Sequence, residues 1–334
     1  MSNETIIQIE DLHIEFSIPR GVVHAVGGIN LEIKKGQIYG IVGESGCGKT
    51  VTGKAILQLV PPPGKIRRGK ILFHGEDLVQ KSEKEMQKLR GRKIAMVFQD
   101  PAAALNPLFT IGDQLMGIMI HHKIAGGDDL HYKAVEIMED LGLPRPKDLL
   151  NAYPHQLSGG MQQRVMIAMA LSAKPDLIIA DEPTSALDVT IQSQLLNLLD
   201  RLRNERGITI ILITHDLGVV SEICDEMSTF YRGRIVEQGS VREIFHHTKH
   251  PYTKGLLGAV PNPQYLGEEL KVIPGSVPIN LEPIEGCCFA SRCEYVMDGC
   301  YQSDPPFVAL NENHLTACYL YEEGISNGNL QRND

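Results

Sequence analysis

Alternating apolar and polar residues indicate that the chain begins with β-structure. Residues 6–9 and 12–16 alternate in the way that half-buried strands do. Residues 38–42 are continuously apolar, which is typical of a strand buried on both faces of a parallel sheet. A glycine-rich loop follows, and then a helical pattern over 51–60 that the three prolines at 61–63 should end.

The middle of the chain alternates between helical and strand patterns. Apolar positions have helical spacing between residues 101 and 152, and strand patterns return over 177–180 and 208–213. Residues 191–203 carry leucines at helical spacing between these two strands. Strand–helix–strand alternation predicts a parallel sheet of the α/β class.

The composition changes after about residue 250. Residues 251–334 hold 8 of the 19 prolines, and their 4 basic and 11 acidic residues contribute −7 to the net charge of −9. We therefore expect a main domain over 1–250 and a separate acidic, irregular extension over 251–334. Within these we expect a helical subdomain near 100–160 and a disordered tail over 325–334.

The overall composition favours a globular protein of the cytosol. The 334 residues are 43% hydrophobic and 22% charged, close to the globular average. The negative charge, the absence of Trp and an aromatic content of 5% argue against a nucleic-acid partner. Neither an apolar run of membrane-spanning length nor a signal peptide is visible, so the seven cysteines are expected to stay reduced.

The glycine-rich loop carries the first chemical motif. It reads Gly43-Glu44-Ser45-Gly46-Cys47-Gly48-Lys49-Thr50 and fits the pattern G-x-x-x-x-G-K-[ST], between a strand and a helix as that motif requires. Backbone N–H groups of such a loop wrap phosphate oxygens, and the helix N-terminus adds positive potential. We expect Lys49 to reach the β- and γ-phosphates, Thr50 to bind Mg²⁺ and Cys47 to be a spectator thiol.

Two carboxylates follow the strand pattern at 177–180. Asp181 and Glu182 should lie where the carboxyl end of a parallel strand borders the ligand crevice. Asp181 suits a direct or water-mediated contact to Mg²⁺. Glu182 suits a general base that polarises the attacking water. Together with the phosphate-binding loop, these residues predict a nucleotide hydrolase.

A third motif narrows the class of hydrolase. The sequence Leu157-Ser158-Gly159-Gly160-Met161-Gln162-Gln163-Arg164 places N–H groups of Ser158, Gly159 and Gly160 at a helix start, where they can meet a γ-phosphate. The motif resembles the signature of ABC-type ATPases. The resemblance covers about residues 5–245 and implies a RecA-like core with an antiparallel β-subdomain and a helical subdomain. It also implies that the signature meets the ATP of an opposite subunit, so that two subunits share both sites.

Other residues occur in the same order along the chain as the functional residues of this family. The resemblance implies that Gln99 senses Mg²⁺ and the γ-phosphate, and that His215 contacts the γ-phosphate. It also implies that the loop at 185–188 links the two active sites. Phe16 is the candidate for stacking on adenine, although His24 in that role or a core role for Phe16 remains an alternative. The Mg²⁺ site implied in this way comprises Thr50, Gln99 and Asp181.

Further stretches resemble the ATPases of dipeptide/oligopeptide importers, to about residue 322. These stretches are Gln99-Asp100-Pro101, residues 105–107 and 110–114, His250-Pro251-Tyr252-Thr253-Lys254-Gly255-Leu256-Leu257 and residues 273–278. The resemblance implies ATP-driven peptide import, with a second, distinct ATPase, two membrane permease subunits and, indirectly, an extracytoplasmic peptide-binding protein. The chain would then lie peripherally on the cytoplasmic face of the membrane. The alternatives are a nickel or glutathione importer ATPase and, from another class, a non-transport ABC ATPase.

Five cysteines crowd into the extension, and four of them have the spacing C-x5-C-x6-C-x17-C: Cys287, Cys293, Cys300 and Cys318. Four cytosolic thiols in a core-poor segment suggest metal ligation. The spacing is wider than in paired zinc motifs and favours an iron–sulfur cluster, with zinc or unligated thiols as alternatives. The family resemblance implies a [4Fe–4S] cluster. Cys287 matches the first ligand, although the adjacent Cys288 could replace it.

Overall fold

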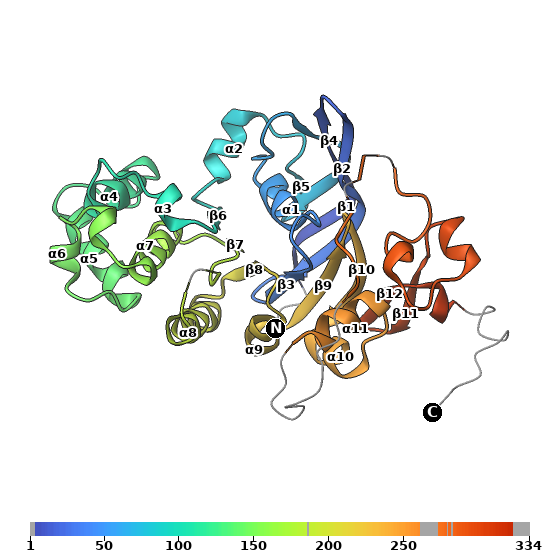
Figure 1. Cartoon of the computed structure of the whole chain (residues 1–334). Helices are drawn as coiled ribbons and strands as arrows, with labels where there is room; N and C mark the ends of the chain where they lie inside the picture. The colour runs from blue at the N-terminus through green and yellow to red at the C-terminus, as the bar shows by residue number, and fades with distance from the viewer. Residues whose placement is uncertain (1–3, 186, 261–272, 279, 282, 323–334) are drawn as a thin grey trace. The chain divides into compact units, whose positions relative to one another are not determined.

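The computed structural model describes two compact units of the chain (Figure 1). The residues that it describes are 4–185, 187–260, 273–278, 280–281 and 283–322. Unit 1 contains residue 4 and residues 34–38 and 80–213. Unit 2 contains residues 5–33 and 39–79 and the residues from 214 onward.

Unit 1 contains a parallel sheet, as the alternation of patterns predicted. Its strands are β6 (Ile94–Val97), β7 (Leu177–Asp181) and β8 (Thr209–Thr214), in the order β8-β7-β6. Both neighbouring pairs are parallel. Every residue of β7 and β8 is buried, which explains why these strands have no polar alternation.

The helices of unit 1 include those expected between residues 101 and 152. They are α2 (Glu83–Leu89), α3 (Pro101–Ala104), α4 (Ile111–His121), α5 (Asp128–Asp140), α6 (Pro146–Leu149), α7 (Gly159–Leu171) and α8 (Val189–Arg206), with a 3₁₀ turn at Pro154–Gln156. Helix α8 is longer at both ends than its leucine spacing predicted. The Asp188 side chain accepts the N–H of Ile191 at its start, and Gly207 with φ 64° ends it.

Unit 2 begins with an antiparallel sheet that confirms the expected β-subdomain. Its strands are β1 (Thr5–Ile18), β2 (Gly21–Lys34), β4 (Gly64–Phe73) and β5 (Glu76–Asp77), in the order β2-β1-β4-β5. The two short patterns in 6–16 belong to one strand. They are separated by a register shift between Glu10 and His13, where Asp11 has φ 47°.

The other strands of unit 2 are β3 (Ile38–Val42), β9 (Glu226–Tyr231), β10 (Arg234–Ser240), β11 (Phe307–Asn311) and β12 (His314–Ala317), in the order β11-β12-β10-β9-β3. Its helices are α1 (Lys49–Ile56), α9 (Leu217–Ile223), α10 (Val241–His247) and α11 (Pro251–Gly258), with 3₁₀ turns at Ala290–Arg292, Asp298–Tyr301 and Tyr319–Tyr321. Helix α1 ends before residue 60, where its prediction placed the end, because Gln58 adopts φ 51°.

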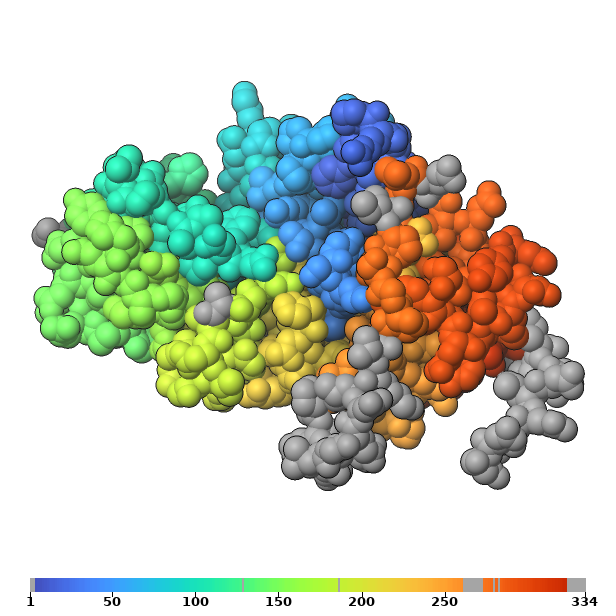
Figure 2. All heavy atoms as spheres, viewed as in Figure 1, coloured from blue at the N-terminus to red at the C-terminus, as the bar shows by residue number. Residues whose placement is uncertain are grey.

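The cysteine-rich extension packs on β9 and β10 of unit 2. A buried cluster joins Tyr231 and Val236 of these strands to Tyr252, Cys288 and Phe289. Strands β11 and β12 extend the same sheet through β10, which the sequence did not predict because both are short. In Figure 2 the orange residues of the extension lie directly against blue residues of the first part of unit 2.

Two predictions fall partly or wholly outside the described residues: Ala186 of the 185–188 loop and the tail at 325–334. The boundary at residue 250 and the limits of the helical subdomain stay predictions. Among the described helices, none combines the length and the apolar character needed to cross a bilayer.

Candidate functional site

The glycine-rich loop of unit 2 requires glycine at two of its positions. Gly43 follows the fully buried strand β3 at φ 153°, and a Cβ there would collide with the carbonyl oxygen of Phe230. Gly48 has φ 103° and precedes α1, and a Cβ on it would lie 2.5 Å from the carbonyl oxygen of Ala25. The loop is therefore shaped by close backbone approach from two other segments of the same unit.

Lys49 is the first residue of α1 and is buried, with 5% of its surface exposed. Its Nζ donates to the carbonyl oxygens of Gly43 at 2.7 Å and Glu44 at 3.1 Å. These contacts fold the side chain back over the loop, where a phosphate group would meet it. Cys47 is fully buried, and that burial raises the pKa of its thiol despite the neighbouring Lys49, which agrees with a spectator role.

The strand-end carboxylates belong to unit 1, where the structure brings two predicted site residues together. Asp181 is the last residue of β7 and is 3% exposed. The Nε2 of Gln99 donates to Oε2 of Glu182 at 3.1 Å. Glu182 has φ 46°, and its N–H donates to the carbonyl of Ile213 at 2.8 Å. A non-glycine residue in this region is strained, and such strain is common at functional positions.

The signature residues also belong to unit 1, at the start of α7. Ser158 is the N-cap, and its Oγ accepts the N–H of Met161 at 3.4 Å. Gly159 and Gly160 form the first turn, so that their N–H groups have no partner within the helix. The turn lines an open pocket of about 450 Å³, to which Arg164 and Asp188 also contribute. The pocket offers room for an anion at a positive helix end.

Two other predicted residues lie in unit 2. His215 is exposed in the turn between β8 and α9, and this turn is fixed by Asp216, whose carboxylate accepts the N–H of Gly218 at 2.8 Å. Phe16 is half-buried on β1, opposite Gly64 of β4. Its ring lies so close to Gly64 that a Cβ there would be 2.6 Å from the ring edge.

The four predicted cluster ligands line one pocket of unit 2. Cys287, Cys293, Cys300 and Cys318 surround a free space of about 10 Å³, together with His250, Phe289 and Met297. This is about the space of one water molecule. Within the described ranges, no three His, Cys, Asp or Glu side chains are grouped closely enough to hold a metal ion.

Burial disfavours the thiolate form of three cysteines in this pocket. Burial raises the pKa of Cys287 to about 11 and that of Cys318 to about 12, and it also raises the pKa of Cys293. The other three cysteines of the pocket each raise the pKa of Cys318 further. Thiolate ligation would therefore have to release these protons.

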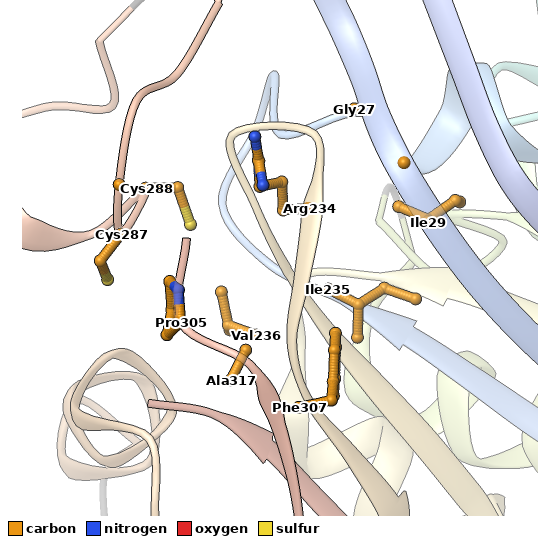
Figure 3. A pocket seen from close by; sticks show the side chains of 12 residues that line it. Gly27, Ile29, Arg234, Ile235, Val236, Cys287, Cys288, Pro305, Phe307 and Ala317 are labelled. Atoms are coloured by element: carbon orange, nitrogen blue, oxygen red, sulfur yellow. The ribbon is translucent and has the colours of Figure 1, made fainter. Parts of the chain in front are cut away.

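Cys288 does not line this pocket. It lines a second pocket of about 60 Å³, with Arg234, Pro305 and Phe307, which Cys287 also borders. Figure 3 shows the side chains of Cys287 and Cys288 at this second pocket. Burial raises the pKa of Cys288 to about 12.

Two residues of the extension contact the glycine-rich loop, and the sequence assigned neither of them this role. The Tyr252 hydroxyl accepts the N–H of Glu44 at 2.9 Å, and the guanidinium of Arg292 pairs with the Glu44 carboxylate. The two residues are 208 and 248 positions away from Glu44 in the chain. A single sequence carries no signal for such contacts.

Comparison with known proteins identifies the class to which this fold and these motifs belong. Residues 26–185 match the family described as ABC transporter. The dimeric structure of MJ0796, a bacterial ABC transporter cassette, superposes with a TM-score of 0.64 at 29% identity, over 71% of this chain and 99% of that one. The cassette cbiO1 from Clostridium perfringens gives a TM-score of 0.63 at 31% identity, over 73% and 92%. The protein is an ATPase of the ABC class.

The relatives define the family within this class. The oligopeptide transport ATP-binding protein OppD of Bacillus subtilis is 46% identical over 94% of this chain and 88% of its own length. The dipeptide transport ATP-binding protein DppD of the same organism is 44% identical over 96% of both chains. Residues 236–300 match the family described as oligopeptide/dipeptide transporter, C-terminal region. The chain belongs to the ATP-binding subunits of oligopeptide and dipeptide ABC transporters, which confirms the resemblance seen in the sequence.

Proposed function

We propose that this chain hydrolyses ATP to drive the import of peptides through a membrane transporter. The observation that carries the proposal is the similarity to the peptide-transport subunits over nearly the whole chain, including their particular C-terminal region. The test is uptake of a labelled dipeptide, a labelled pentapeptide and radioactive nickel by cells that lack this chain, with and without a plasmid copy. Restored peptide uptake supports the proposal, whereas restoration of nickel uptake alone favours the nickel importer.

Each candidate residue has a proposed role in binding or hydrolysing ATP. Ser45, Gly46, Gly48 and Lys49 of the glycine-rich loop would hold the phosphates, and Thr50 and Asp181 would hold Mg²⁺. Glu182 would take a proton from the attacking water. Its hydrogen bond with Gln99 supports this assignment, because Gln99 can orient the carboxylate and report on Mg²⁺. His215 would contact the γ-phosphate, and Phe16 would stack on adenine.

The signature turn requires a second subunit. Its N–H groups face an open pocket and would bind the γ-phosphate that a partner ATPase presents. The relative MJ0796 was solved as a dimer, which supports this arrangement. The isolated chain should therefore be a poor ATPase. Hydrolysis that is linear in enzyme concentration, from a demonstrated monomer, would contradict the shared site.

Membrane subunits would dock on unit 1 near Gln99. Two large apolar residues, Leu108 and Phe109, lie between α3 and α4 and are 81% and 52% exposed. Single exposed apolar residues are common, but two adjacent ones in the segment that follows Gln99 suit a protein contact. Replacing both with Ser should uncouple the chain from the permease in a co-purification and leave ATP binding unchanged.

The proposal also includes a [4Fe–4S] cluster that is bound by four cysteines: Cys287, Cys293, Cys300 and Cys318. The donor set supports it, because four thiols line one pocket, whereas Cys288 does not line that pocket. The space among the thiols is small, so loading would have to widen it. When bound, the cluster would cross-link a loop-rich segment.

The cluster is tested on protein that is purified without exposure to air. It should be brown and contain about four iron and four sulfide per chain. Cys293→Ser should remove the colour, while Cys288→Ser serves as the matched control and should keep it. Stoichiometric zinc without iron would instead establish the zinc alternative.

A further inference from the structure

The first variable residue of the phosphate-binding loop, Glu44, is bound through its side chain by the C-terminal extension. Nη1 of Arg292 donates to Oε2 of Glu44 at 2.8 Å, and Nη2 donates to Oε1 at 3.2 Å. This is a two-pronged guanidinium–carboxylate pair, the strongest geometry for such a contact. The Arg292 side chain is 6% exposed and that of Glu44 is 29% exposed, so water competes little for the pair.

The other donors of Arg292 are also occupied by unit 2. Its Nε donates to the carbonyl of Pro274 at 2.7 Å, and Nη2 reaches the carbonyl of Gly275 at 3.2 Å. Nη1 donates to the hydroxyl of Tyr231 at 3.3 Å, and the guanidinium lies 5.7 Å from the centre of that ring. A guanidinium has five N–H donors, and these contacts occupy all of them. Arg292 is therefore built to hold the protein rather than to bind a phosphate itself.

The backbone of Glu44 is held from the same extension. Its N–H donates to the hydroxyl of Tyr252, the second residue of α11, at 2.9 Å. Tyr252 is fully buried and packs against Tyr231 and Phe289 with ring centres 4.6 and 5.4 Å apart. The carbonyl of Glu44 accepts from Lys49, which would contact the phosphates. A shift of Glu44 would therefore move the lysine's acceptor and the N–H groups that follow in the loop.

We propose that Arg292 is a positioning residue for ATP binding: its paired contact with Glu44 lets the C-terminal extension hold the phosphate-binding loop in its binding shape. The inference rests on the proposed ATP-binding role of that loop. It assigns to the extension a direct effect on nucleotide affinity, in addition to any cluster. Because an ordered loop does not have to be ordered again when ATP binds, loss of the contact should weaken binding.

The test is equilibrium binding of Mg·ATP to the full-length chain, with thermal unfolding recorded for each variant. Arg292→Ala should raise the Kd about 10-fold, and Arg292→Lys about 3-fold, because an ammonium cannot form the two-pronged pair. In the assembled transporter, Arg292→Ala should raise KM for ATP and leave kcat nearly unchanged, because Arg292 is not among the residues proposed to carry out the chemical step. Equal affinity of both variants and the unmodified chain would overturn the proposal.

A matched control separates loop positioning from general loosening of the extension. Arg234 of β10 forms an ion pair with Asp304 of the extension and donates to the carbonyl of Ile284 at 3.3 Å. Arg234→Lys weakens this contact of the extension but keeps the backbone of the neighbouring Gly233, whose N–H donates to the carbonyl of the loop residue Cys47 at 2.9 Å, so it should leave ATP affinity unchanged. An equal loss of affinity in Arg234→Lys and Arg292→Lys would overturn the proposal.

Two further variants keep the outcome decisive if Arg292→Ala folds poorly. Glu44→Gln preserves the side-chain shape and removes the charge. In the double variant with Arg292→Lys, the loss of ATP affinity should be smaller than the product of the two single losses. Multiplying effects would overturn the proposed pairing. Lys49→Ala tests the underlying function. If it also leaves ATP affinity unchanged, the ATP-binding role of the loop fails; if only the Arg292 variants do, the positioning role alone fails.

Discussion

The phosphate-binding loop of unit 2 and the signature turn of unit 1 both present N–H groups at the start of a helix, but they are held in different ways. The loop is enclosed by backbone carbonyls of Ala25 and Phe230 and is bound by Arg292. The signature turn is held by contacts within unit 1, namely its cap Ser158 and the Gln162 side chain, which donates to the carbonyl of Pro154 at 2.8 Å, and it borders an open pocket of about 450 Å³.

The difference concerns what each of these two regions can do by itself. A loop that is held by distant segments can have its binding shape before ATP arrives, so its affinity is a property of the single chain. A turn that is held locally and borders an open pocket can act only on a phosphate that a partner subunit presents to it. The comparison therefore predicts that changes in the loop affect ATP binding or folding, while changes in the turn affect hydrolysis by the assembled pair.

The largest expected effect comes from Glu182, the proposed general base, which belongs to neither the loop nor the turn. Glu182→Gln should slow hydrolysis by about 10²–10³-fold, because the amide cannot accept a proton from water. ATP affinity should be retained, and the closed dimer should accumulate. The measurement is single-turnover hydrolysis in the assembled transporter, together with Kd for ATP. Unchanged turnover would remove Glu182 from this role.

The next effect compares one glycine from each region. Gly43→Ala should lower the free energy of unfolding by about 2–4 kcal/mol, because its Cβ would meet the carbonyl of Phe230 at φ 153°. Gly159→Ala should change it by less than about 0.5 kcal/mol, because nothing lies within 4 Å of a Cβ there. Urea unfolding of both variants measures the difference, and similar losses would contradict the contrast between the two regions.

A charge at the signature turn should have a smaller effect, confined to the assembled pair. Ser158→Asp keeps an N-cap side chain but places a carboxylate where a γ-phosphate would bind, so hydrolysis by the assembled pair should fall about 10–100-fold. Ser158→Asn is the matched neutral control. Both variants should bind ATP as the unmodified chain does when isolated. A loss of binding by the isolated Ser158→Asp chain would mean that the turn acts within one subunit.

The smallest effect should come from the hydroxyl of Tyr252. Tyr252→Phe removes one acceptor for the N–H of Glu44 but keeps the buried ring, so ATP affinity should fall about 2–5-fold, as expected for one neutral hydrogen bond. Titration of Mg·ATP against the full-length chain measures it. An effect larger than that of Arg292→Ala would show that the backbone contact, rather than the ion pair, holds the loop.

Much of the fold could be predicted from local sequence. The continuous apolar run at residues 177–180 reflects a strand that is buried on both faces, and the leucine spacing in α8 reflects a helix that is buried on one face. The end of α1 and the strands β11 and β12 were missed. They depend on a single left-handed residue, Gln58, and on pairing with β10 from far along the chain.

The candidate site likewise contains features that the sequence predicted and features that only the tertiary structure revealed. The sequence by itself determined the chemical groups, because Lys49, Asp181 and Glu182 stand in motifs whose spacing places N–H groups and carboxylates at strand and helix ends. Only the tertiary structure decided that Cys287 rather than Cys288 faces the other cysteines, and that Arg292 pairs with Glu44. Adjacent thiols are equivalent in a sequence, and a contact across 248 residues depends on how the sheet and the extension pack.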